Sequence, residues 1–269
     1  MIYLSQLLSD EDLYLLSARY HTGLELIDFS VGMNLDLGES FLHSWEQRKL
    51  DLGNPPLTCH GPFLDLNPAS YDSAVQNTAC LRFSQAYEAA RKLGAARIIY
   101  HTCRIPQTCY VAGWSQRLAG FYQEFLEHHT SLPVAVENVF DESPYPIADL
   151  ASHIHASHFS LCLDVGHAHA FSTVPVKEWI TVLSPWITHL HLHDNHGTKD
   201  EHLPIGEGTL PWEEIFPLLQ ALPRLAGITL ENTSAEDFIL SLQRLSQWQF
   251  FPSQVPYTAD KNSSSHWNP

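Results

Sequence analysis

The sequence is poor in charge, and in positive charge above all. Only 16% of its 269 residues are Asp, Glu, Lys or Arg, where about 25% is usual. Fourteen Lys and Arg face thirty Asp and Glu, which leaves a formal net charge of −16. Proteins that bind the phosphate backbone draw their affinity from Lys and Arg, so this composition argues against a nucleic-acid partner.

The sequence also lacks the segments that direct a chain into a membrane. No run of about 18 apolar residues occurs, and the first five residues have neither the basic region nor the long apolar core of a signal peptide. The five Cys are odd in number and include no Cys-x-x-Cys pair. We therefore expect no membrane span, and a cytoplasmic protein with reduced thiols.

Histidine is the residue in clear excess. The chain has 17 His, more than its 14 Lys and Arg together. Neutral imidazole is a common metal ligand in proteins. The composition therefore favours a metal site.

Short apolar runs alternate with stretches of helical periodicity, which is typical of repeated βα units. No G-x-G-x-x-G or G-x-x-x-x-G-K follows any run, so the Rossmann and P-loop signatures are missing. The runs predict eight strands, at 1–5, 24–30, 57–61, 96–101, 133–138, 159–164, 187–193 and 226–231. We expect an α/β fold, a single (β/α)8 TIM barrel over residues 1–252, with an open doubly wound sheet as the alternative. Residues 253–269 are polar and aperiodic, and we expect a loose tail there.

Six possible metal ligands end or nearly end these strands. They are His60, His101, Glu137, Asp164, His191 and Glu231. They recur 27 to 41 residues apart, one for each βα unit. Because the active site of such a barrel is built at the C-terminal ends of its strands, we expect a metal site there.

Three further ligand candidates lie in the loops beyond the strands: His167, Asp200 and His202. Nine ligands exceed the four to six that one transition-metal ion takes, so more than one ion is implied. Taken singly, a strand-end residue is equally consistent with a polar position on the rim. A buried unpaired carboxylate is costly, however, so Glu137 and Glu231 need a partner.

Two more histidines share the face of the seventh strand that carries His191. His189 and His193 alternate with it in sequence, and side chains two residues apart point to the same side of a strand. Either one can replace His191 as a ligand or form hydrogen bonds beside it. This choice stays open at the level of the sequence.

The order of these residues resembles that of the xylose isomerase-like TIM-barrel superfamily, which contains endonuclease IV and many sugar-phosphate isomerases and epimerases. The order His…His…Glu…Asp-x-x-His…His…Asp-x-His…Glu runs through nearly the whole barrel, from about Met1 to Glu231. The resemblance implies up to three divalent ions, of Zn, Mn or Fe. It implies a first ion on His60, His101 and Glu137, a second on Glu137, Asp164, His191 and Glu231, and a third on His167, Asp200 and His202.

Two local departures separate the chain from endonuclease IV. The motif Val165-Gly166-His167 stands where the endonucleases usually have Thr-Cys-His, and His193-Asp-Asn-His-Gly stands where they have an Asn-Asp-Ser-Lys type of sequence. These motifs look more like those of proteins usually described as sugar-phosphate isomerases or epimerases. Three divalent ions would raise the net charge from −16 only to −10, a poor field for attracting DNA.

Two chemistries fit such a site. In sugar isomerisation or epimerisation, Glu137 or Glu231 moves a proton between carbons while metal ions bind adjacent substrate oxygens. In phosphoester hydrolysis of the endonuclease IV kind, a metal-bound hydroxide attacks phosphorus. The complete ligand set favours hydrolysis, whereas the composition and loop motifs favour the first chemistry. A metal-binding scaffold without turnover would be favoured by missing ligands, and none is missing.

Residues beside the ligands are candidates for binding the substrate. Arg104 and Lys199 are among the few cations on loops expected to overhang the rim, and two isolated cations suit one small phosphate or carboxylate. Other flanking residues can hydrogen-bond sugar hydroxyls or orient the ligating imidazoles. These are Asn138, His193, Asp194, Glu207 and Asn232. We expect a small sugar or sugar phosphate as the partner.

Overall fold

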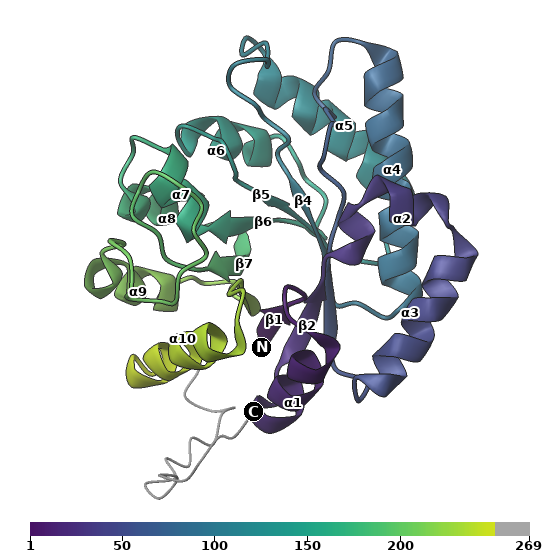
Figure 1. Ribbon diagram of the computed structural model, residues 1–269. Helices are drawn as coiled ribbons and strands as arrows, with labels where there is room; N and C mark the ends of the chain where they lie inside the picture. Colours follow the sequence, from purple (N-terminus) through teal and green to yellow (C-terminus); the bar gives the residue numbers. More distant parts are fainter. Residues whose placement is uncertain (251–269) are drawn as a thin grey trace, which may run out of the picture.

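Eight parallel strands close into one barrel in chain order, in a computed structural model that describes residues 1–250 (Figure 1). Each strand pairs with its sequence neighbours, and β1 pairs with β8 to complete the ring. The strands are β1 Ile2–Ser5, β2 Gly23–Leu26, β3 Leu57–His60, β4 Ile98–His101, β5 Val134–Glu137, β6 Phe159–Asp164, β7 Ile187–Leu192 and β8 Gly227–Leu230. The predicted (β/α)8 barrel is confirmed, and the open sheet is excluded.

Helices surround the barrel on all sides (Figure 1). They are α1 Asp10–Tyr20, η1 Asp28–Ser30, α2 Gly32–Asp36, α3 Glu39–Asp51, α4 Ser73–Lys92, α5 Trp114–His128, α6 Tyr145–Ser152, α7 Val165–Phe171, α8 Val176–Leu183, α9 Trp212–Gln220 and α10 Ala235–Gln247. The core lies between this ring and the strands. Tyr100 of β4, for example, stacks on Phe83 of α4 with 4.1 Å between ring centroids.

The barrel interior is narrow and mixed in character. Ile99, Ala135 and Cys162 pack together inside it, all buried. Above and around this small apolar layer, the inward positions are polar, because His, Glu and Asp occupy the strand ends. The interior therefore holds buried charge that needs partners.

The second strand is shorter than the sequence predicts, ending at Leu26 instead of residue 30. The side-chain oxygen of Gln6 accepts the N–H groups of Ile27 and Asp28, at 2.9 and 3.2 Å. The chain then turns into the 3-10 helix η1, where the Asp28 carboxylate accepts hydrogen bonds from Trp45 and Arg48 of α3. These side-chain bonds replace the sheet hydrogen bonds that a longer strand would need.

Some predicted features lie outside the described part of the chain. The polar tail expected at 253–269 falls beyond residue 250, so the structure does not describe it. Within residues 1–250, no helix is long and apolar enough to cross a membrane. All five cysteines lie in the described part, and none of them forms a disulfide.

Candidate metal centre

The parallel register brings the strand ends to a single rim. His60, His101, Glu137 and Asp164 are the last residues of β3 to β6. Across the sheet His101 is aligned with Glu137, and Asp164 with His191. Glu231 directly follows β8. The six strand-end candidates therefore lie on one ring, although up to 171 residues separate them in sequence.

Glu137 lies at the middle of this ring. Its Oε2 is 3.4 Å from His60 Nε2 and 3.7 Å from His101 Nε2, and its Oε1 is 3.3 Å from Nδ1 of both His167 and His191. Burial raises the pKa of Glu137, but the surrounding imidazoles outweigh burial and hold that pKa well below its usual value. The carboxylate is therefore charged and ready to bind a cation.

Three histidines are oriented by their own neighbours. Nδ1–H of His60 donates to the carbonyl of Gly61 at 2.9 Å, that of His167 to Asn138 at 3.0 Å, and that of His202 to Glu231 at 2.7 Å. A carbonyl only accepts, so Nδ1 of each ring carries a proton and Nε2 is the atom left to bind a metal. This arrangement is typical of metal-binding imidazoles. Burial lowers the pKa of these three imidazoles, but neighbouring carboxylates outweigh burial and raise it, so a metal would bind in exchange for the Nε2 proton.

His101, by contrast, is held in the neutral form by burial. Burial lowers the pKa of His101 to about 3, because a low-dielectric environment disfavours the charged ring. Its ring stacks on Phe63 with 4.1 Å between centroids. A neutral imidazole is the form that binds a metal.

The loop-borne candidates gather beside the ring. Asp200 Oδ2 is 3.2 Å from His167 Nε2 and 3.0 Å from His202 Nε2. Asp164 is also the N-cap of α7, since its Oδ1 accepts the N–H of His167 at 2.7 Å. The Asp-x-x-His spacing thus serves as a helix cap that sets His167 against the ring.

The donor atoms fit divalent cations. Several groups of three His, Asp, Glu or Cys ligand atoms lie within 4.8 Å of one another, among them His60–His101–Glu137 and His193–Asp200–His202. Within the described residues, Glu137 Oε2 and His191 Nδ1 are buried without a hydrogen-bond partner. Buried polar atoms are rarely left unpaired, so a group with positive charge suits this position.

A cavity of about 330 Å³ opens directly over the ring. Seven of the nine predicted ligands line it: His60, His101, Glu137, His167, Asp200, His202 and Glu231. The other two, Asp164 and His191, are fully buried. Leu7, Ile27, Phe63, Val139 and Phe140 form an apolar wall. A concave site of this size, with polar groups converging on one end, is typical of a small-molecule site.

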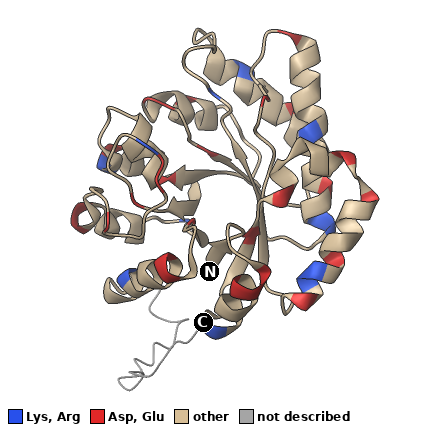
Figure 2. Ribbon diagram, viewed as in Figure 1, with Lys and Arg blue, Asp and Glu red and all other residues tan. Residues whose placement is uncertain are grey.

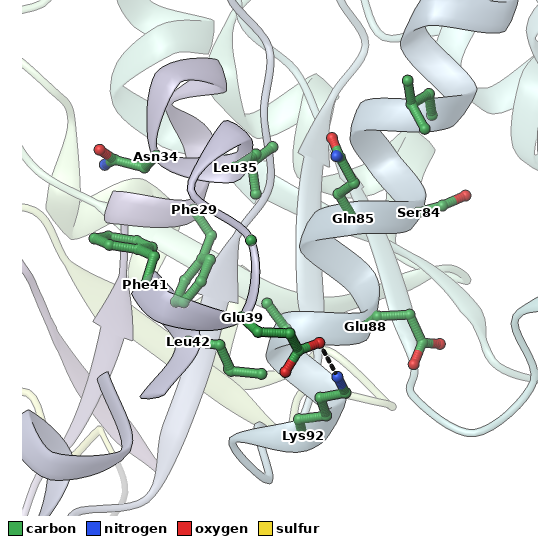
Figure 3. Close-up of a pocket in the computed structure, with 13 residues that line it drawn as sticks. Phe29, Asn34, Leu35, Glu39, Phe41, Leu42, Ser84, Gln85, Glu88 and Lys92 are labelled. Carbon is green, nitrogen blue, oxygen red and sulfur yellow. Dashed lines mark hydrogen bonds and ion pairs between the residues drawn. The ribbon is translucent and has the colours of Figure 1, made fainter. Parts of the chain in front are cut away.

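A second cavity, of about 410 Å³, lies outside the barrel between the α2–α3 segment and α4 (Figure 3). Glu39 and Lys92 form an ion pair at its edge, 2.6 Å apart. None of its lining residues in the described chain is a predicted ligand. This outer cavity is therefore separate from the ring of candidate ligands.

Two important residues of the ring are not in the predicted ligand set. Glu25 of β2 is fully buried, accepts a hydrogen bond from Thr229 at 2.7 Å, and lies 3.0 Å from His191 Nε2. In the sequence, the signal for Glu25 is a single carboxylate inside the short apolar strand Gly23–Leu26, because a buried carboxylate needs a partner. His193, predicted to be an alternative ligand, a substrate contact or a hydrogen-bonding neighbour, is fully buried with its Nε2 3.2 Å from Asp164.

His189 forms hydrogen bonds beside the ring of candidate ligands. Its Nε2 donates to Thr229 Oγ1 at 2.8 Å, and Thr229 donates in turn to Glu25. Burial lowers the pKa of His189 well below its usual value, so the imidazole of His189 is neutral. Its hydrogen bond to Thr229 favours the role of a hydrogen-bonding neighbour, and Glu25, His189 and His191 also form a group of possible ligands.

Three of the residues that flank the ligands form hydrogen bonds within the site, which agrees with the second role predicted for them, that of orienting the ligands. The Asn138 side chain bonds both main-chain groups of Asp164, accepting at 3.0 Å and donating at 2.9 Å. Asp194 accepts from Trp212 Nε1 at 2.7 Å. Asn232 donates to the His202 carbonyl at 3.3 Å. All three asparagine and aspartate side chains are buried, so they orient ligand-bearing segments.

Among residues 1–250, no Lys or Arg lines the cavity over the ring, and Figure 2 shows Lys and Arg mainly on the outer helices. Arg104 was expected to overhang the rim, and this expectation is wrong. Its side chain is buried 3.7 Å from Asp141 and 3.6 Å from Glu142, with its guanidinium over the Trp114 ring. Because a buried guanidinium needs carboxylate partners, the chain turns it inward.

The other two residues predicted to bind the substrate, Lys199 and Glu207, lie at the surface. Lys199 is exposed on the loop that carries Asp200. Glu207 is exposed and lies 3.4 Å from Arg244 of α10. Neither lines the cavity over the ring.

Comparisons with known proteins agree with this fold. An uncharacterized protein of Methanocaldococcus jannaschii is 27% identical over 203 residues, which are 71% of this chain and 69% of the relative. Among solved structures, a D-tagatose 3-epimerase-like protein is 23% identical, with a TM-score of 0.75 over 92% of this chain and 96% of its own. A Thermus thermophilus protein soaked with ZnCl2 is also 23% identical, with a TM-score of 0.72 over 92% and 97% of the two chains.

Residues 31–246 match the family described as xylose isomerase-like TIM barrel. This range covers β3 to β8, and with them the whole ring of candidate ligands except Glu25. The chain therefore belongs to the xylose isomerase-like TIM barrel family.

Proposed function

We propose that this protein is a metal-dependent isomerase or epimerase of a small sugar or sugar phosphate. The observation that carries the proposal is the cavity of about 330 Å³ whose inner end is formed by seven candidate ligands. Its size suits one small polyhydroxylated molecule. The similarity to a D-tagatose 3-epimerase-like protein supports the same class of substrate.

In this proposal, nine residues hold up to three divalent ions, of Zn, Mn or Fe. His60, His101 and Glu137 hold one, Asp164, His191 and Glu231 join Glu137 around a second, and His167, Asp200 and His202 hold a third. When bound, such ions polarise a carbonyl or lower the pKa of a hydroxyl group. The ZnCl2 soak of a structural neighbour supports binding of a divalent ion.

Proton transfer between carbons falls to Glu137 and Glu231. Each has an oxygen 3.3 Å from His191 Nδ1, so the two carboxylates flank this imidazole. In an epimerisation, one carboxylate removes a proton from one face of the carbon, and the other, in its protonated form, delivers a proton to the opposite face. The apolar wall around Phe63 and Val139 excludes water from the reacting carbon.

Metal analysis of protein purified without chelator, followed by a substrate screen in D2O, tests the proposal. Ketoses, sugar phosphates and abasic-site DNA form the panel. We expect divalent metal in the protein and solvent deuterium on the carbon of a converted sugar, since the transferred proton exchanges with solvent. Full metal content with no sugar turned over would contradict the proposed activity.

A second candidate is phosphoester hydrolysis of the endonuclease IV kind. The complete outer set, with His167, Asp200 and His202 held together by distances of 3.0 and 3.2 Å, favours it. Efficient cleavage of abasic-site DNA without sugar turnover would decide for this alternative. No Lys or Arg of the described residues lines the cavity, and this argues against hydrolysis of DNA, because a DNA strand needs several cations along a groove.

A further inference from the structure

His193 is packed more tightly than a substrate contact needs to be. It follows β7 directly and is fully buried. Its ring lies parallel to that of His202, with 4.4 Å between centroids and 10° between planes. It does not line the cavity over the ring. The burial excludes direct contact with a molecule in that cavity.

Gly166 makes the space that His193 occupies. A Cβ at position 166 would collide with three atoms of the His193 imidazole. The imidazole is thus held between the backbone of α7 on one side and His202 on the other. Glycine at 166 and histidine at 193 are the two departures from the endonuclease IV pattern. They depend on each other, because the His193 imidazole fits only where residue 166 has no side chain.

The Nε2 atom of His193 points at carboxylates from three different segments. It lies 3.2 Å from Asp164 Oδ1, 3.5 Å from Asp200 Oδ1 and 3.9 Å from Glu231 Oε2. The same Asp200 carboxylate places its other oxygen 3.0 Å from His202 Nε2. The ligand atoms of His193, Asp200 and His202 lie within 4.8 Å of one another.

We propose that His193 is a tenth metal ligand, which binds through Nε2 at the outer position together with His167, Asp200 and His202. This inference rests on the proposed metal dependence but not on the identity of the substrate. Three imidazoles and one carboxylate give the four ligands that a transition-metal ion such as zinc takes. The outer ion is thereby joined to the end of β7 as well as to α7 and to the loop of Asp200 and His202.

NMR of full-length protein labelled with 15N-histidine and loaded with 113Cd2+ tests the ligand directly. We expect the Nε2 resonance of His193 to be split by coupling to cadmium, and we assign it by its loss in His193→Asn. The same variant should bind the outer ion more than about 100-fold more weakly, a larger loss than the 10- to 100-fold that follows removal of an orienting partner. An unsplit Nε2 resonance, or an unchanged outer affinity in the variant, would overturn the inference.

Gly166→Ala provides a second variant that leaves every ligand in the chain. Its methyl group should displace His193 and weaken the outer ion as strongly as His193→Asn does. In the double variant the methyl group has room, so no further loss is expected. His169→Asn is the matched control, because His169 lies on the same helix but bonds Thr209 at 3.0 Å. Additive losses in the double variant would contradict the steric coupling.

The outcomes separate this inference from the proposed function. Cadmium coupling to His193 in a protein that converts no sugar would uphold the ligand and overturn the activity. Sugar turnover by a protein whose His193 is uncoupled would do the reverse. A chain that binds no divalent metal would overturn both.

Discussion

The strand-end ligands and the loop-borne ligands are held in different ways. Glu137 and His191 sit on paired strands and are only 1% and 0% exposed. The side chains of Asp200 and His202 are 27% and 23% exposed, on an irregular segment in which His202 adopts a positive φ of 52°. Groups on strands are positioned more firmly than groups on loops. In the proposed centre we therefore expect the inner positions to hold metal more firmly than the outer position.

The largest effect is expected from removing a strand-end carboxylate. Glu231→Ala should remove the inner metal and the activity together, with metal affinity falling by more than about 100-fold, because a direct ligand is lost. Metal analysis and circular dichroism check this result, and the fold should survive. Glu124→Ala, an exposed carboxylate on α5, is the control. Full metal retention in Glu231→Ala would contradict the assignment.

Loss of a loop-borne ligand should act on the outer ion alone. His202→Ala is expected to release one ion and keep the inner ions, and dialysis of the wild type against a chelator should remove the same ion first. Metal content per chain against time at neutral pH measures both. Release of all ions in a single step would contradict the division into two regions. Low pH is not a suitable condition, since protonated imidazole does not bind metal.

A substitution of Glu25 tests whether the carboxylate beside His191 strengthens binding of the inner ion. Glu25→Gln keeps the shape of the side chain but removes the charge 3.0 Å from His191 Nε2. We expect the inner ion to bind about 10- to 100-fold more weakly, as is typical when a partner of a ligating histidine is lost. Isothermal titration with Zn2+ measures the change. An unchanged inner affinity would show that the strands alone position His191.

The smallest effect is expected at the exposed end of the outer loop. If Lys199 binds a substrate phosphate, Lys199→Ala should raise KM for a sugar phosphate by about 10-fold and leave KM for the unphosphorylated sugar unchanged, since one charge-assisted hydrogen bond is lost. The free energy of unfolding should change by less than about 0.5 kcal/mol. Equal changes in both KM values would remove Lys199 from the substrate site.

The sequence determined the barrel and its strand-end candidates because both depend on local patterns. Short apolar runs bury four to six residues each, and the last inward residue of each run has to lie at the rim. His60, His101 and Asp164 could therefore be placed from their position at the end of a run. The end of β2 could not, because Gln6, far away in sequence, supplies the hydrogen bonds that stop the strand at Leu26.

Only the tertiary structure decided how the flanking residues divide between substrate, ligand and support. Arg104 is three residues from His101 in sequence, yet Asp141 and Trp114 turn it away from the cavity. His193 and Gly166 are 27 residues apart, and their fit exists only where α7 crosses the end of β7. The position of a residue in the sequence predicts which strand end it lies near. The direction of its side chain depends on charges and empty space contributed by other segments, and these form only when the barrel closes.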